Sequence, residues 1–80
     1  MDKLGAMRAF VKVAETGSFS AAASLLGRSK AVISKQLAML EAALGVQLLV
    51  RTTRRVRLSD AGRAYLERCA PLLADLEDLE

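Results

Sequence analysis

Apolar residues recur with a helical period in the first half of the chain and predict three helices. The first covers residues 4–16 and ends at Gly17. Its expected core stripe consists of Leu4, Met7, Phe10, Val11 and Ala14. The second is short and rich in alanine, is capped by either Ser18 or Ser20, and ends at Gly27. The third begins after Ser29, a good N-cap, and ends at Gly45. The residues of this third helix expected in the core are Ile33, Leu37, Leu40 and Leu44.

The pattern changes at Val46, after which two short strand-like runs flank a basic segment. The runs are residues 48–50 and 56–58, and the segment between them reads Arg51-Thr52-Thr53-Arg54-Arg55. This pattern predicts a small hairpin. Because its turn contains neither glycine nor asparagine, we expect a longer loop rather than a two-residue type I′ turn.

Ser59 is placed to cap a last helix that runs toward Glu80. Apolar positions on this helix step by four and three residues, at Tyr65, Cys69, Leu72, Leu76 and Leu79. Such a/d spacing is typical of a helix that pairs with another helix, but a stripe of two heptads also fits a helix that covers its own core. Pro71 lies inside this helix and removes one backbone hydrogen bond there.

Charge is distributed unevenly over this pattern. The net charge is +3, but residues 1–68 alone carry +7, from 12 basic and five acidic residues. Residues 69–80 carry −4, from four acids and no base. A basic body with an acidic tail indicates a polyanionic partner for the body. An ordinary solvated basic surface is the alternative.

Length and composition exclude several classes of protein. Eighty residues, 52% of them hydrophobic, predict one folded domain. No apolar run reaches the roughly 18 residues of a membrane span, and the N-terminus lacks the apolar core of a secretory signal. The lone Cys69 cannot form an internal disulfide, so we expect a cytoplasmic protein. Without histidine or a convergent carboxylate pair, the chain is expected to be no enzyme and to hold no metal or cofactor.

The second and third helices, at about residues 19–38, form the pattern of a helix-turn-helix. Two short helices are joined by a turn that contains glycine, and the later helix is basic. The side of this helix opposite its core stripe carries Lys30, Ser34, Lys35 and Ala38, with no acid. The major groove of DNA accepts such a helix, and residues near its N-terminus reach the base edges.

Positions on this helix suggest individual roles. Ser29 caps the helix, whose first turn presents backbone N–H groups to phosphate. Lys30 either donates to a base acceptor such as guanine O6 or N7, or is a solvated lysine. Val32 either touches a thymine methyl group or packs inward. The remaining candidates are Arg28 for phosphate, Ala31 for a thymine methyl group, Ser34 and Lys35 for base edges or phosphate, and Gln36, which is ambiguous between a phosphate contact and a surface position.

The hairpin carries four arginines and no acid, and therefore predicts a basic wing at about residues 48–58. The four are Arg51, Arg54, Arg55 and Arg57. Arginine at the tip of a wing enters the minor groove or holds a phosphate, whereas Arg57 points away from the tip and is expected to be a surface residue. A solvated hairpin is the alternative, but repulsion among four arginines favours an anionic partner.

Several motifs, taken in order, resemble the N-terminal DNA-binding domain of LysR-type transcriptional regulators. They are F-x-x-V-A-E-T-G-S-F-S-x-A-A, S-x-x-x-x-S-K-Q-L-x-x-L-E-x-x-L-G-V-x-L, R-T-T-R and L-S-D-A-G, all within residues 9–62. The resemblance extends over nearly the whole chain. It implies a mainly α fold with a small β-hairpin, in which a winged helix-turn-helix at residues 1–58 is followed by a long linker helix at 59–80.

The resemblance also implies how such a domain acts. Linker helices pair to form a homodimer, here through Tyr65, Cys69, Leu72, Leu76 and Leu79, and two recognition helices read an inverted repeat in double-stranded DNA. The implied DNA contacts fall on Ser29, Lys30, Ala31, Val32, Ser34, Lys35, Arg51 and Arg54. Family members continue into a domain that binds a small-molecule effector, so we expect this chain to be a fragment without it.

One departure from the family pattern bears on specificity. The recognition helix often begins Ser-Gln, whereas this chain has Ser29-Lys30. Lysine only donates hydrogen bonds, which favours guanine acceptors over the mixed edge of adenine. Two other classes remain as alternatives: a protein–protein module that acts through its last helix, and an RNA-binding module, which three aromatic residues disfavour.

Overall fold

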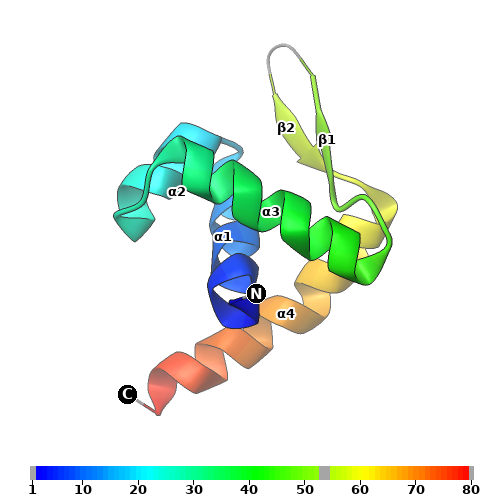
Figure 1. Cartoon of the computed structure of the whole chain (residues 1–80). Coiled ribbons are helices and arrows are strands. Elements are labelled where there is room, and N and C mark those ends of the chain that lie inside the picture. Colours follow the sequence, from blue (N-terminus) through cyan, green and yellow to red (C-terminus); the bar gives the residue numbers. More distant parts are fainter. Residues whose placement is uncertain (1, 53–54, 80) are drawn as a thin grey trace.

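The structure, a computed structural model, describes residues 2–52 and 55–79 and is mainly helical with one small hairpin (Figure 1). Its elements in chain order are α1 (Lys3–Thr16), α2 (Phe19–Leu26), α3 (Lys30–Leu44), β1 (Leu49–Arg51), β2 (Val56–Leu58) and α4 (Asp60–Asp78). The predicted fold class is therefore confirmed. The last helix ends on the side of the molecule away from the hairpin (Figure 1).

Each described helix begins at a side chain that accepts a hydrogen bond from its first turn. Ser29 accepts from the amide of Val32 at 3.1 Å, and Ser18, not Ser20, caps α2 through the amide of Ala21. The other two caps are Asp2 and Ser59. The first three helices end at glycines with left-handed φ angles of 68°, 66° and 72°, at Gly17, Gly27 and Gly45. Residues with a side chain rarely adopt this conformation without strain, so glycine is favoured at the end of each of these helices.

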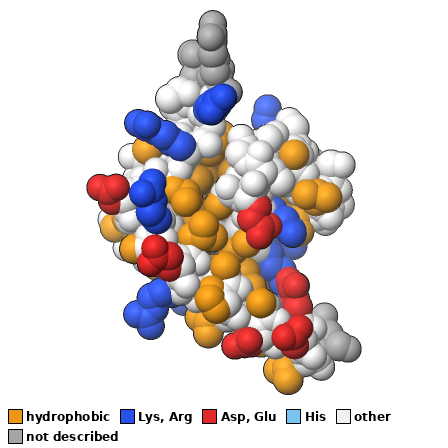
Figure 2. All heavy atoms as spheres, turned by 180° about the vertical axis from the view of Figure 1, so that it is seen from behind, with side chains coloured by type: hydrophobic (Ala, Val, Ile, Leu, Met, Phe, Trp, Pro, Cys, Tyr) orange, Lys and Arg blue, Asp and Glu red, His pale blue; other side chains and the backbone are white. Residues whose placement is uncertain are grey.

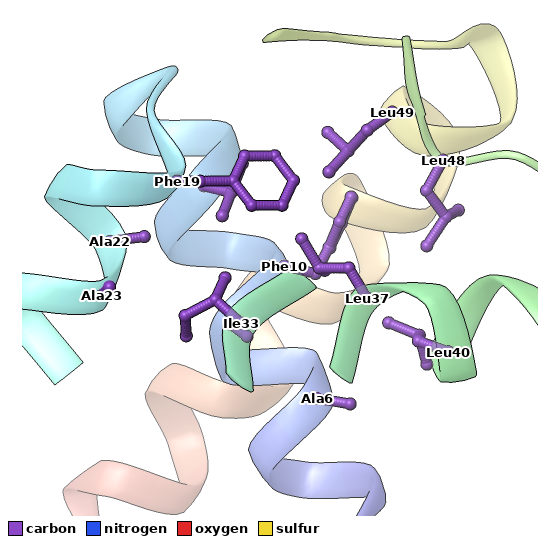
Figure 3. Close-up of a cluster of buried hydrophobic side chains, with 12 residues drawn as sticks. Ala6, Phe10, Phe19, Ala22, Ala23, Ile33, Leu37, Leu40, Leu48 and Leu49 are labelled. Carbon is purple, nitrogen blue, oxygen red and sulfur yellow. The ribbon is translucent and has the colours of Figure 1, made fainter. Parts of the chain in front are cut away.

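The core forms where α1 packs against α2, α3 and α4 (Figure 3). Ile33, Leu37 and Leu40 are fully buried, as the periodicity of α3 predicts. Leu44 was wrongly predicted to be buried: it is the last residue of α3 and is 37% exposed.

The predicted core stripe of α1 is partly wrong. Leu4 is 45% exposed, whereas the residues that face the core are Ala6, Ala9, Phe10 and Val13. Alanine at two of these positions lets the neighbouring helices approach α1 closely, so the buried face is set by packing rather than by the largest side chains.

The apolar seam predicted on α4 divides between two faces. Cys69 is buried, and the ring of Tyr65 packs against Phe10 with 5.5 Å between ring centroids. Leu73, which the sequence pattern left out, is buried beside them. Leu72, Leu76 and Leu79 are exposed by 58%, 37% and 84%. A helix of 3.6 residues per turn drifts away from a 3.5-residue seam, so the core takes one edge of the stripe and leaves the other bare.

The hairpin pairs Leu49 with Leu58, Val50 with Arg57, and Arg51 with Val56 in antiparallel register. β1 begins one residue later than the predicted run, and Leu48 is buried in the core just before it. The Thr52 amide donates to the Arg55 carbonyl at 2.8 Å. The predicted longer loop and the candidate contact Arg54 fall on residues 53–54, outside the described residues.

Hydrogen bonds from two helices fix the base of the hairpin. A carboxylate oxygen of Glu41, on α3, accepts from the amides of Leu48 at 2.7 Å and Leu49 at 3.2 Å. At the start of α4, the Ser59 amide donates to the Leu48 carbonyl at 2.9 Å, and the Ser59 hydroxyl donates to the carbonyl of Gln47. At Gly62, an added Cβ would lie 2.0 Å from the Leu48 carbonyl oxygen, so only glycine allows this approach. The hairpin is therefore held at a fixed position relative to α3.

None of the helices within the described part of the chain is both long and apolar enough to cross a membrane.

Replacing Glu41 with Gln should destabilise the domain. The variant keeps the shape of the side chain but turns two charge-assisted hydrogen bonds into neutral ones, so we expect a loss of about 1–2 kcal/mol in the free energy of unfolding. Urea unfolding measures this loss, and hydrogen exchange of the Leu48 amide should become faster. Glu15→Gln is the control, because the ion pair of Glu15 with Lys12 is exposed. Equal losses in the two variants would contradict a special role for Glu41.

Stability should fall as the pH rises above the ordinary thiol pKa of about 8.5. Burial raises the pKa of the Cys69 thiol, and burial followed by the charge of a Cys69 thiolate raises that of the Tyr65 hydroxyl. A raised pKa means that the folded state holds the proton more tightly. The resulting stabilisation is complete below the unfolded-state pKa and is lost as the pH passes the folded-state value. Between pH 7 and 10, the free energy of unfolding measured with urea should decline less steeply for Cys69→Ala than for the native domain. Identical slopes of this free energy against pH would contradict this account.

Candidate nucleic-acid interface

The N-terminal half of α3 presents a bare face beside its buried stripe. Lys30, Ala31 and Lys35 are exposed, and Ser34 is half-buried. Val32 is 45% exposed, so of its two predicted placements the structure has the outward one. The Ser29 cap lies at the same end, where the helix dipole places partial positive charge. This end of α3 therefore combines donors, small apolar side chains and a positive potential.

A cleft runs between this face of α3, the start of α2 and the hairpin. Its lining residues are Gly17, Ser18, Phe19, Ser20, Lys30, Ser34, Arg51, Thr52, Arg55 and Val56. Among the described residues that line the cleft, three are cations and none is an acid. The N-terminus of α2 opens into the same cleft and adds the positive end of a second helix dipole. The fold thus brings three separate segments of the sequence into one site suited to an anion.

Arg51 lies over an aromatic ring at this cleft. Its guanidinium carbon is 4.1 Å from the centroid of the Phe19 ring, while the ring itself is buried in the core. Arg55 and Arg57 are also exposed. Arg57 follows Val56 on the strand and so projects from the opposite face of the hairpin, as its predicted surface position requires.

Arg28 contacts the protein itself, which the sequence did not indicate. Its Nη1 donates to the Gly5 carbonyl at 3.1 Å and to the Gln36 side-chain oxygen at 2.9 Å. The two bonds tie the turn of the helix-turn-helix to α1 and α3. The ambiguous Gln36 is accordingly half-buried and acts as an acceptor within the domain. The pairs 5–28 and 28–36 follow no local spacing rule, so no sequence signal could have found them.

Glu41 was also missed as a functional element, although it sets the position of the hairpin relative to the exposed face of α3. The available signal was an acid among the apolar residues that end α3, four residues before Gly45. One group of acidic side chains gathers at the end of the molecule away from the hairpin (Figure 2), where α4 ends with Asp75, Glu77 and Asp78. Other acidic side chains lie elsewhere on the same face (Figure 2).

Comparison with known proteins gives a consistent result. The sequence model of the bacterial regulatory helix-turn-helix proteins of the lysR family matches residues 4–63. An HTH-type transcriptional repressor of Pseudomonas aeruginosa is 50% identical over 80 residues, which are 100% of this chain and 25% of that protein. The chain thus spans about a quarter of the length of this curated relative.

Two solved structures share the fold. An H2O2-bound mutant of Corynebacterium glutamicum OxyR has a TM-score of 0.92 and 38% identity, over 95% of this chain and 24% of that one. A BenM_DBD complex with catB site 1 DNA has a TM-score of 0.89 and 34% identity, over 95% of this chain and 84% of that one. With its four helices, two-stranded hairpin and matched residues, the chain belongs to the LysR family of bacterial transcriptional regulators and is a winged helix-turn-helix DNA-binding domain of that family.

Proposed function

We propose that this domain binds double-stranded DNA at specific sequences, with the start of α3 in the major groove and the hairpin as a wing on the backbone or in the minor groove. One observation carries this proposal: the exposed face of α3 borders a cleft whose described lining residues include three cations and no acid. The fold shared with BenM_DBD, which was solved with DNA, supports it.

The exposed residues of α3 divide by chemistry. Lys30 and Lys35 donate hydrogen bonds, and Lys30 sits on the first turn, where base edges come within reach. Ala31 and Val32 offer methyl groups to thymine. Ser29 and Ser34 hold hydroxyls near the cleft and fit phosphate or base edges. We therefore assign sequence readout to the first turn of α3, and in particular guanine to Lys30.

The arginines are assigned to the backbone. Arg51 and Arg55 line the cleft, and Arg54 belongs to the same wing by its place in the sequence. Arg28 is held against α1 through one nitrogen, but a guanidinium has five donors and keeps others for a phosphate. Contacts of this kind place the domain on the duplex without reading sequence.

A homodimer on an inverted repeat is part of this proposal. Leu72, Leu76 and Leu79 form an exposed apolar edge on α4 that a second copy would cover. Tyr65 and Cys69 pack on the chain's own core, so we rest the contact on the three leucines. We further propose that residues 59–80 act as the linker helix, that a full-length protein of the relatives' size adds the effector-binding domain, and that it works in the bacterial cytoplasm.

Selection of bound duplexes from a random pool should yield two related half-sites in inverted orientation. The purified domain is the probe, and the selected duplex is then used to measure affinity between about 50 and 200 mM salt. Each phosphate contact contributes about −0.9 to the slope of log affinity against log salt, so several contacts give a steep fall. Absence of any duplex binding in dilute salt would contradict the proposed function and favour the protein–protein alternative.

Replacing Lys30 with Ala should weaken binding by an amount that depends on the sequence. If Lys30 reads a base, the loss should be about 1–3 kcal/mol on the selected site and small on sites altered at the base it reads. Lys3→Ala, on α1, is the control for the loss of one positive charge. An equal loss on every duplex would assign Lys30 to phosphate instead.

Replacing Leu76 with Asp should convert the dimer to a monomer and lower the affinity for a two-half-site duplex, because a charge then lies in the apolar edge. Leu44→Asp is a matched control, since Leu44 is also 37% exposed but lies on α3. Sedimentation measures the oligomeric state. An unchanged sedimentation profile for Leu76→Asp would exclude a dimer formed through this edge of α4.

A further inference from the structure

One contact links the helix-turn-helix to the wing at the cleft, between the aromatic ring of Phe19 and the guanidinium of Arg51. Phe19 is the first residue of α2, is 6% exposed, and belongs to the core cluster together with Leu49 of the hairpin (Figure 3). Arg51 is exposed at the end of β1. The guanidinium carbon lies 4.1 Å from the ring centroid, within the range of a cation–π contact. A buried aromatic ring thus contacts an exposed, charged group.

This contact leaves the hydrogen-bonding capacity of the arginine free. A guanidinium stacks through its planar face, whereas its N–H donors point outward in the plane. A guanidinium over the ring can therefore still bind a phosphate through its N–H donors. Lysine has the same charge but no planar face, so it cannot be held over the ring in the same way.

The contact also fixes where the charge lies. Arg51 shares the lining of the cleft with Lys30 and Ser34 of α3 and with Ser18 and Ser20 at the start of α2. An unsupported arginine on a two-stranded hairpin samples many rotamers, and ordering it on binding costs conformational entropy. The Phe19 ring orders the side chain beforehand.

We propose that Phe19 is a positioning residue for DNA binding: the face of its ring holds Arg51 in the cleft, so that the guanidinium is set to receive a backbone phosphate before the duplex arrives. This inference rests on the proposed DNA binding and adds to it a residue that does not itself touch DNA. Phe19 therefore has two roles, one in the core and one at the interface, and they can be separated experimentally.

The test replaces Phe19 with phenylalanines that carry one, two or three ring fluorines, which withdraw negative charge from the ring face and change the side-chain volume little. Affinity for the selected duplex should fall stepwise with fluorination, to about two- to fivefold below the native domain. The same series in an Arg51→Ala background is the matched control, and there the affinity should not change with fluorination. The proposal would be overturned if the affinity of the native background did not change with fluorination, or if it fell equally in both backgrounds.

Melting temperatures measured without DNA show whether the contact between Phe19 and Arg51 forms in the free domain. A melting temperature that falls with fluorination in the native background, but not in the Arg51→Ala background, reports this contact. A fall of the same size in both backgrounds reports core packing. If the native domain binds no duplex, the proposed function and this inference both fail. If the duplex binds but the affinity is insensitive to fluorination, only the inference fails.

Arg51→Lys provides a second readout with ordinary residues. The charge is kept, so the salt slope should stay near the native value, while the affinity falls because the side chain is no longer held over the ring. Arg51→Ala should instead reduce the magnitude of the slope by about 0.9. Arg57→Lys, on the opposite face of the hairpin, is the control and should leave both quantities unchanged. Native affinity in Arg51→Lys would overturn the role of the ring.

Discussion

The burial of one face of α3 against α1 is the constraint on which the rest of the structure depends. Ile33, Leu37 and Leu40 are held in a core whose other side is built partly from alanines, which brings the helices close together. Because that face is fixed, the opposite face can carry lysines and small residues without any contribution to folding. The hairpin and its cations are in turn positioned from α3, through Glu41.

The sequence predicts the features that depend on local chemistry. Serine caps, glycine ends and the 3.6-residue period locate α2 and α3 closely, because each is decided within a few residues along the chain. The exposed lysines of α3 follow from the same period. Features that depend on distant partners were missed. They are the hydrogen bond from Arg28 to the Gly5 carbonyl, the contact of Arg51 with the Phe19 ring, and the hydrogen bonds from the Leu48 and Leu49 amides to Glu41.

The differences between the predicted apolar stripes and the buried residues of α1 and α4 have one cause. Periodicity gives the apolar side of a helix, but which part of that side is buried depends on where the neighbouring helices lie. On α4 the core takes the edge that holds Cys69 and Leu73 and leaves Leu72 and Leu76 bare. On α1 the core includes Ala6 and Ala9, whereas Leu4 is exposed. A resemblance to a family supplies the arrangement of the helices, but it does not resolve this finer choice.

The absence of a side chain at Gly62 has a mechanical consequence. The first turn of α4 lies directly against the Leu48 carbonyl and is bonded to it through Ser59, so the start of α4 and the base of the hairpin move as one body. In a pair of such domains joined through α4, changing the crossing angle of the two helices would swing each wing together with its own α3. The distance between two binding surfaces would then be controlled from the far end of α4, with no internal rearrangement of either domain.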